Sequence, residues 1–139
     1  MNPSVIYLTE NMTLLECANI FYQNNISGGP VINEHEEIIG EITEKELIKV
    51  AMPAYLDLMN DLSFLKEFEP FESFYKQASQ IAVKNIYKSE YTAVSVDTPI
   101  IEIAFLVTRK NVRRIFVVDE KKLIGIIMRR DIITQVLHS

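Results

Sequence analysis

The chain has 139 residues, of which 48% are hydrophobic, and a formal net charge of −5. This length suits one compact unit with a substantial core, and the acidic balance argues against a nucleic-acid binder. No apolar run is long enough to cross a bilayer, the N-terminus lacks the features of a signal peptide, and a lone cysteine, Cys17, excludes an internal disulfide. We therefore expect a soluble, cytoplasmic protein with no direct membrane insertion.

Charge is distributed unevenly along the chain. Residues 1–70 carry three Lys or Arg side chains against twelve carboxylates, whereas residues 71–139 carry eleven against seven. The second half could therefore hold a small anion, and binding sites in the two halves are expected to differ electrically.

The first part of the chain is predicted to form a strand over residues 5–8, a helix over residues 13–23 and then a hairpin entered through residues 28–30. Gly40 lies inside the second strand of this hairpin, where a glycine usually marks a bulge or a close backbone approach. A closing helix is expected to begin near Thr43.

Residues 53–82 are predicted to be a helical insert, because apolar residues recur at helical spacing on both sides of Pro70. Its aromatic residues are Phe64, Phe68, Phe71, Phe74 and Tyr75. They either cover the core of the same chain or form a surface for a partner, since exposed aromatic residues concentrate at interfaces.

The second part is predicted to have the same order of elements. A strand over residues 91–96 ends at a turn, and Pro99 suits the first position of the helix that follows. The apolar runs 115–118 and 123–127 form a second hairpin, and a closing helix begins near Arg129.

These two parts are copies of one unit. The offset between matching residues is 86 from Leu14 and Ile100 onward, and it becomes 85 at Gly40 and Gly125 because one turn is shorter. A repeated unit rarely buries its apolar face alone. We therefore predict an α/β (α+β) fold in which two β-α-β-β-α units, residues 1–52 and 83–139, pack with pseudo-two-fold symmetry and form two related clefts.

The repeated unit resembles the CBS domain, named after cystathionine β-synthase. The resemblance rests on Gly29-Pro30-Val31 before the first hairpin and on Gly40 through Glu46, which match the pattern Gly-apolar-apolar-Thr-x-x-acid. Two copies in tandem resemble a CBS pair, or Bateman module. The resemblance implies a regulatory module that binds an adenosine-containing ligand (AMP, ADP, ATP or S-adenosylmethionine), forms homodimers and regulates an enzyme or transporter.

The resemblance also implies which residues bind the ligand. In the second cleft, Asp131 is expected to accept hydrogen bonds from ribose hydroxyls. The positive charge of Arg113, Arg114, Arg130 and the neighbouring Arg129 is suited to an anion. The predicted second-cleft residues are Tyr87, Thr92, Val112, Arg113, Arg114, Met128, Arg130 and Asp131.

The first cleft is expected to bind more weakly. Glu41, Glu44 and Glu46 lie near one strand-helix junction, where they are expected to repel phosphate. The predicted residues of this cleft are Ile6, Ser27, Gly28, Thr43 and Glu46.

Simpler interpretations of these residues remain open. Asp131 could cap its helix, and Thr43 with Glu46 forms a capping-box pattern that needs no ligand. Cys17 is interpreted as a core residue, and His35 and His138 lie too far apart in the sequence to suggest a metal site.

No nucleophile-base pair or phosphate-binding glycine loop is visible, so we expect no enzyme and no required cofactor. The leading hypothesis is a sensor that binds an adenine nucleotide mainly in the second cleft. The alternative is a structural dimerisation module with degenerate clefts, which Met128, Glu46 and Phe116 favour because they replace the family's usual residues. Surplus apolar residues on both closing helices predict a homodimer.

Overall fold

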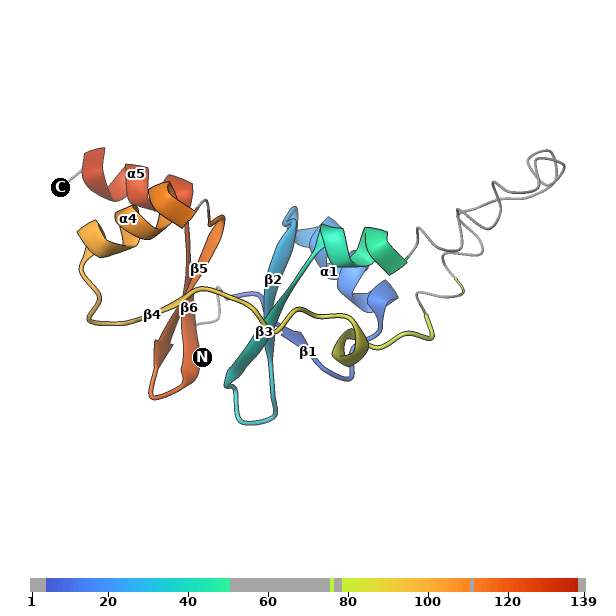
Figure 1. The fold of residues 1–139 in the computed structure, drawn as a ribbon. Coiled ribbons are helices and arrows are strands. Elements are labelled where there is room, and N and C mark those ends of the chain that lie inside the picture. Colours follow the sequence, from blue (N-terminus) through green and yellow to red (C-terminus); the bar gives the residue numbers. More distant parts are fainter. Residues whose placement is uncertain (1–4, 51–75, 77–78, 111, 138–139) are drawn as a thin grey trace, which may run out of the picture.

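The computed structural model describes residues 5–50, 76, 79–110 and 112–137. Two halves stand side by side, and each is a small sheet with helices on its outer side (Figure 1). The helices α4 (Ile100–Lys110) and α5 (Arg129–Leu137) lie at one end of the molecule, and α1 (Leu14–Asn24) lies at the other. The predicted aromatic residues of the insert and most of its predicted helices lie outside the described residues. Residues 79–82 are described and are not helical, so the prediction is wrong there: the Ile81 carbonyl accepts a hydrogen bond from the Leu14 N–H at 2.9 Å, and Ala82 forms a bridge with Thr13.

The first repeat contains strands β1 (Leu8–Thr9), β2 (Gly28–Ile32) and β3 (Ile38–Thr43). Helix α1 connects β1 to β2, and a helix of residues 44–50 follows β3 directly. Strand β1 pairs in parallel with β2, which pairs antiparallel with β3. Parallel neighbours need a crossover between them, and α1 supplies it.

The second repeat has the same architecture. Strands β4 (Ala93–Ser95), β5 (Arg114–Asp119) and β6 (Lys122–Met128) form a sheet in the order β4-β5-β6, with α4 between β4 and β5 and α5 after β6. The pairing is again parallel and then antiparallel. The predicted pair of β-α-β-β-α units is therefore confirmed.

Local signals determine where α1 begins and ends. The Thr13 hydroxyl accepts a hydrogen bond from the backbone N–H of Glu16 at 3.2 Å, and the Glu16 carboxylate accepts one from the Thr13 N–H at 3.3 Å. This capping box satisfies donors that the first helical turn leaves unpaired. At the other end Asn25 takes a left-handed conformation with φ of 52°, which asparagine tolerates better than most residues.

Each hairpin carries an irregularity at the same place. The register shifts directly after Val31 in β2 and directly after Val117 in β5. These two residues lie opposite Gly40 and Gly125, respectively. The bulge that the strand glycines predict is therefore confirmed in both repeats.

The first strand of each repeat is shorter than predicted. The structure forms a strand at Leu8–Thr9 where residues 5–8 were expected, and at Ala93–Ser95 where residues 91–96 were expected. The segment before each short strand also contacts the other repeat. Apolar alternation indicates that a residue is buried, and it does not show which sheet buries it.

The segments that enter the two repeats pack across the interface. Val5 belongs to a buried cluster that includes Phe116 of the second repeat. At the equivalent position, Tyr91 contacts the Phe116 ring, with 6.3 Å between centroids, and its hydroxyl donates to the Ile38 carbonyl at 3.4 Å. Each repeat therefore contributes its entry segment to the contact with the other.

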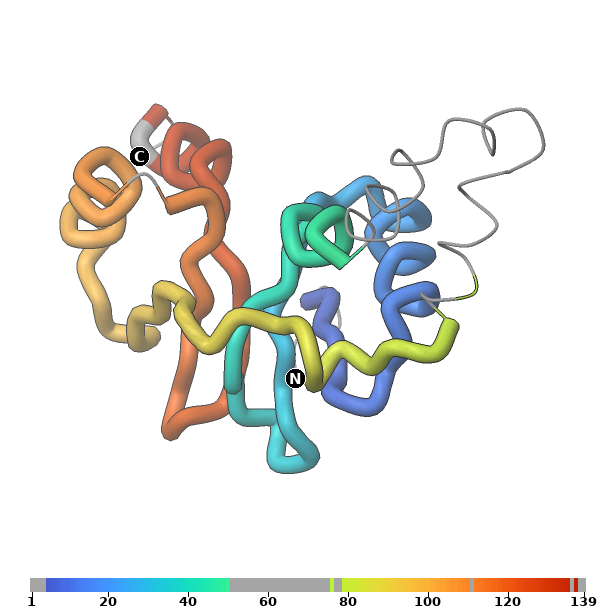
Figure 2. The backbone as a smooth tube through the Cα atoms, turned by 45° about the vertical axis from the view of Figure 1, so that its right-hand side comes forward, coloured from blue at the N-terminus to red at the C-terminus, as the bar shows by residue number. Residues whose placement is uncertain are grey.

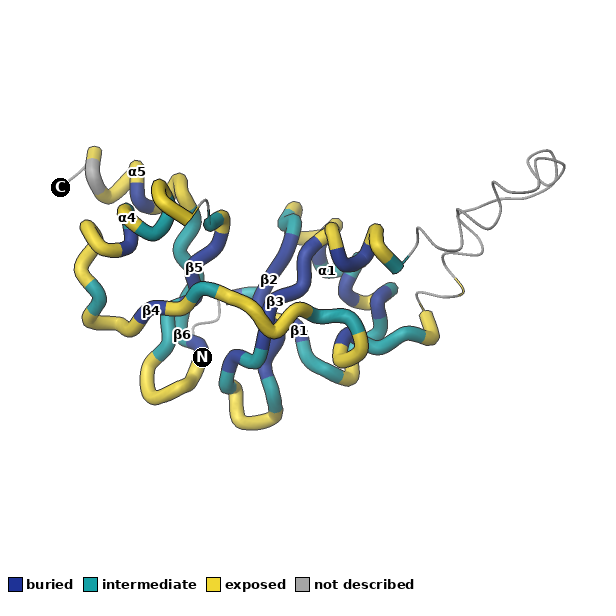
Figure 3. The backbone as a smooth tube through the Cα atoms, in the orientation of Figure 1, coloured by how far each residue is buried: buried dark blue, intermediate teal, exposed yellow. Residues whose placement is uncertain are grey.

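Figure 3 colours the backbone by burial, and buried residues lie along β2 and β3 and in parts of the second sheet. Their side chains form three clusters. One fills the first repeat beneath α1 and includes Cys17, and a second fills the space between α4, α5 and the second sheet. The third lies between the repeats and consists of Val5, Ile32, Ile38, Phe116 and Leu123. A shared apolar cluster of this kind holds the repeats together, because separating them would expose it to water.

The connector into the second repeat is fastened along the first repeat, and Figure 2 shows it passing from one half to the other. Val83, in the short 3₁₀ helix η2 (Val83–Asn85), is fully buried, and its N–H donates to the Met12 carbonyl at 2.8 Å. Further along, Lys88 and Glu41 exchange two backbone hydrogen bonds of 2.9 Å each. The connector thus runs against β3 before it reaches its own repeat.

This contact explains why Gly40 must be a glycine and provides a test. A Cβ at Gly40 would lie 2.4 Å from the Lys88 carbonyl oxygen and 2.4 Å from Cδ2 of Tyr87. At Gly125 the nearest described atom is Cβ of Val117, at 3.8 Å.

We expect Gly40→Ala to lower the free energy of unfolding by about 1–3 kcal/mol, as overpacking does, and Gly125→Ala by less than about 1 kcal/mol. Urea unfolding of both variants checks this, and equal losses would contradict it.

Candidate functional site

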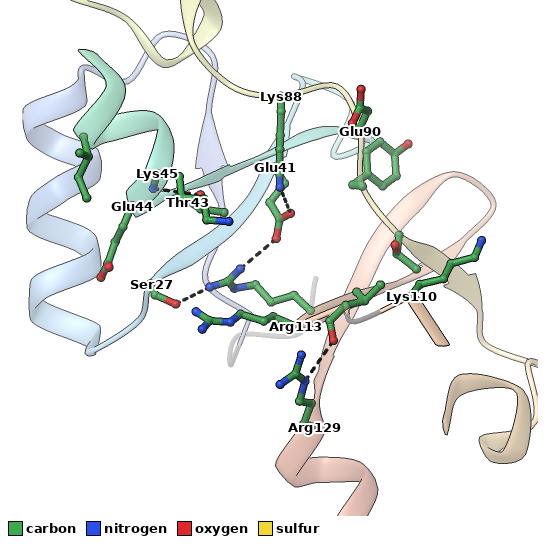
Figure 4. A pocket seen from close by; sticks show the side chains of 15 residues that line it. Ser27, Glu41, Thr43, Glu44, Lys45, Lys88, Glu90, Lys110, Arg113 and Arg129 are labelled. Carbon is green, nitrogen blue, oxygen red and sulfur yellow. Dashed lines mark hydrogen bonds and ion pairs between the residues drawn. The ribbon is translucent and has the colours of Figure 1, made fainter. Parts of the chain in front are cut away.

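A cleft of about 720 Å³ opens between the two repeats (Figure 4). The first repeat contributes the start of β2, the end of β3 and the helix of residues 44–50, through Ser27, Glu41, Thr43, Glu44, Lys45 and Ile48. The connector contributes Lys88, Glu90, Tyr91 and Thr92. The second repeat contributes Lys110, Val112, Arg113, Arg114 and Arg129.

A buried guanidinium lies at the centre of this cleft. Arg114 begins β5 and is 7% exposed. Its Nη1 lies 3.2 Å from Oε2 of Glu41, and its Nη2 donates to the hydroxyl of Ser27. Lys88 lies 3.4 Å from the other oxygen of the same Glu41 carboxylate. One carboxylate of the first repeat therefore holds two cations that come from the connector and the second repeat.

Gly28 makes room for the Arg114 side chain. A Cβ at Gly28 would lie 2.8 Å from the guanidinium carbon. Gly28 and Arg114 occupy equivalent positions in the two repeats, so the larger side chain of one repeat fills the space that the smaller residue of the other leaves. Arg114 lines the cleft as predicted for a ligand-binding residue, and its guanidinium is bonded to Glu41 and Ser27.

The three acidic residues at the β3-helix junction lie in different surroundings. Glu41 is paired with Arg114 and Lys88. Glu46 is 9% exposed and is turned back onto Thr43. Of the three glutamates expected to repel phosphate, Glu41 and Glu44 line the cleft, and the charge of Glu41 is balanced. Across the cleft, six cationic side chains face three carboxylates, which suits an anion.

Both acids of the repeated motif cap helices. The Glu46 carboxylate accepts hydrogen bonds from the N–H and the hydroxyl of Thr43, at 3.1 and 3.0 Å. At the equivalent place, Asp131 accepts one from the Met128 N–H at 2.7 Å. These hydrogen bonds are the ones expected if the two acids cap their helices. A carboxylate in the first turn of a helix is stabilising there without a ligand.

The structure brings together residues from both predicted sets. The predicted residues that line the cleft are Thr92, Val112, Arg113, Arg114, Ser27 and Thr43. Those that do not line it are Tyr87, Met128, Arg130, Asp131, Ile6, Gly28 and Glu46. Tyr87, expected to close the second cleft, lies against Gly40 of the first repeat instead, because the connector crosses to that repeat.

Sequence reasoning missed six residues of this cleft: Lys45, Ile48, Lys88, Glu90, Tyr91 and Lys110. Lys45 fills an unspecified position of the repeated motif, Ile48 follows the motif in the same helix, and Lys110 ends α4. The other three lie in the connector, which joins the site only because it crosses between the repeats. The polar and aromatic composition of residues 88–92, which run into the strand predicted over residues 91–96, was the available signal.

The described residues offer no group of three or more His, Cys, Asp or Glu side chains that could hold a metal ion. His35 is exposed and lies near Glu34, and His138 lies outside the described residues. Within the same described part of the chain, no helix is both long and apolar enough to span a membrane.

The CBS domain family model matches residues 1–53 and 83–138, so this chain belongs to the CBS domain family and carries two copies of the domain in tandem. The chain is 30% identical to the uncharacterized protein MJ1426 of Methanocaldococcus jannaschii, over 94% of this chain and 84% of that protein. It is 27% identical to the uncharacterized protein MJ1225 of the same organism, over 96% of this chain but 40% of that longer protein.

Solved structures share the fold at low sequence identity. A CBS domain-containing protein of unknown function from Kribbella flavida matches with a TM-score of 0.81 and 16% identity, over 99% of this chain and 95% of that chain. CBSX2, solved in complex with AMP, matches with a TM-score of 0.72 and 18% identity, over 96% of this chain and 88% of that chain. At these identities the likeness establishes the fold alone.

Cys17 is the only cysteine and is fully buried, as predicted for a core residue. Burial raises the pKa of its thiol to about 12, so little of it is the nucleophilic thiolate at pH 8. We expect a disulfide reagent such as Ellman's reagent to react at least about 100-fold more slowly with the folded chain than with the chain in urea. Equal rates would show that the thiol is accessible.

Proposed function

We propose that this CBS pair is a non-catalytic regulatory module that binds an adenine nucleotide in the cleft between its repeats. The observation that carries the proposal is the surplus of cationic side chains in a cleft of about 720 Å³ to which both repeats contribute. A ligand held there touches both repeats at once. Its binding energy can therefore favour one arrangement of the repeats over another, which is what a sensor requires.

The cleft offers suitable groups for each part of a nucleotide. Arg113 extends into the cleft toward Ser27 (Figure 4), and Lys45 and Lys110 add positive charge on opposite walls. Guanidinium groups bind phosphate oxygens in a fork geometry. Apolar surface for a base comes from Val112 and from the ring of Tyr91. The AMP complex of a protein with the same fold is consistent with this assignment.

A second candidate function has an observation of its own. Glu46 and Asp131, the two acids that the family resemblance assigns to ribose, are engaged in helix capping. This favours a structural module that dimerises and holds a partner without a nucleotide. The two functions differ in one measurable property, which is the affinity of the cleft for nucleotides.

Isothermal titration with AMP tests the main proposal. We expect Arg113→Ala to weaken AMP binding by about 10- to 100-fold, the loss of about 1.5–3 kcal/mol typical of a hydrogen bond to a charged group. Arg130→Ala is the matched control, because Arg130 is also an exposed arginine of the second repeat but does not line the cleft. We expect this control to change affinity by less than about threefold.

Two outcomes of the same titration would contradict the proposal. Binding of adenosine as tight as that of AMP, with no weakening as salt rises, would point to a neutral or cationic ligand such as S-adenosylmethionine. Absence of binding by any of AMP, ADP, ATP and S-adenosylmethionine would favour the structural module.

We also propose a homodimer, through the outer face of the second repeat. Leu47 and Ile132, at equivalent positions of the closing helices, face their own cores. On the outer face, large apolar side chains are exposed by 77% at Ile101, 56% at Phe105 and 58% at Ile133. An apolar patch spread over α4 and α5 is unusual on a soluble monomer, and a two-fold dimer covers it symmetrically.

Light scattering checks the dimer. We expect twice the chain mass of 16.0 kDa, and we expect Ile101→Asp to shift the protein to the monomer because it places a charge in the apolar contact. Tyr22→Asp is the control, since Tyr22 is 88% exposed on α1 of the other repeat. A monomer at high concentration, or equal effects of both variants, would reject this interface.

A further inference from the structure

Two residues break the internal symmetry at the floor of the cleft. Arg114 stands where the first repeat has Gly28, and Glu41 stands where the second repeat has Ile126. Both charged residues are buried, at 7% and 8% exposure, and they are bonded to each other at 3.2 Å. The equivalent positions form the same strands without charge, so the fold does not require this pair.

Stability gives only a weak reason for the pair. Removing two charges from water costs about as much as their attraction returns, and replacing a buried pair by apolar residues is often neutral. The position of the pair is more informative than its strength. The Glu41 carboxylate lies inside a cleft with cationic walls, and its two oxygens hold Arg114 and Lys88. The Glu41 carboxylate is therefore paired with two cations that would otherwise be able to bind an anionic ligand.

We propose that Glu41 is a specificity-determining residue that limits how many phosphate charges the cleft accepts. This rests on the proposed function, in which an anion occupies the cleft. A ligand with one phosphate finds cations in Arg113 and Lys45 without disturbing the Glu41 pair. Each further phosphate brings negative charge toward the Glu41 carboxylate and must compete with it for Arg114 and Lys88.

The consequence is selection for monophosphates by repulsion of longer phosphate chains. A fixed carboxylate in a binding site discriminates against the more highly charged ligand, as like charges do at protein interfaces. A cleft without Glu41 would have the opposite preference, since its cations would favour the ligand with the most negative charge. The charge of one side chain therefore decides the order of affinities.

Inorganic probes test this without adenine. Phosphate, pyrophosphate and tripolyphosphate are titrated into the wild-type chain, Glu41→Gln and Glu44→Gln. Glu44→Gln is the matched control, because it removes the same charge from the cleft wall but leaves the Arg114 pair intact. We expect the wild-type chain to bind tripolyphosphate no more tightly than phosphate. We expect Glu41→Gln to bind tripolyphosphate at least about tenfold more tightly than wild type, and Glu44→Gln less than about threefold.

Several results would overturn the inference. One is a wild-type affinity that rises about threefold or more from phosphate to tripolyphosphate; this result needs no variant and so does not depend on whether Glu41→Gln folds. Another is an equal gain in tripolyphosphate affinity for Glu41→Gln and Glu44→Gln. A chain that follows the predicted series but does not bind AMP would refute the adenine assignment and leave the selection by Glu41 standing.

Discussion

The exchange of entry segments between the repeats is the constraint on which the rest of the structure depends. Paired backbone hydrogen bonds tie Lys88 to Glu41 of the first repeat, and Val5 packs against Phe116 of the second. Because each repeat holds the other's entry segment, the two sheets are joined by backbone as well as by apolar contact. The starts of β2 and β5 then face each other, and the space between them is the cleft.

A nearly symmetric backbone carries an asymmetric set of charges. Equivalent positions hold Gly28 and Arg114, and a second equivalent pair holds Glu41 and Ile126. The arginine of one repeat fills the space beside the glycine of the other and meets the glutamate there. Duplication of one unit thus provides two related surfaces, and substitution on each side turns the space between them into one site with a cationic surplus.

The site could be predicted from sequence only in part. The motif residues Ser27, Thr43, Arg113 and Arg114 do line the cleft, because they lie at strand and helix starts that the repeat places at the interface. Tyr87 does not, because the segment that carries it crosses to the first repeat. Motif matching assumes that a residue serves its own repeat, and this assumption fails where the chain exchanges segments.

The sequence by itself determined the two β-α-β-β-α units, the helix-capping pair Thr43 and Glu46, and the bulges opposite the strand glycines. These features depend on residues a few positions apart, through hydrophobic periodicity and local hydrogen bonds. Only the tertiary structure decided that Arg114 bonds to Glu41, which lies 73 residues away in the sequence. It also decided that residues predicted for two separate clefts line the same cleft. A buried charge pairs with an opposite charge that tertiary packing places close to it. The residues next to Arg114 in the sequence do not determine how close Glu41 lies to it.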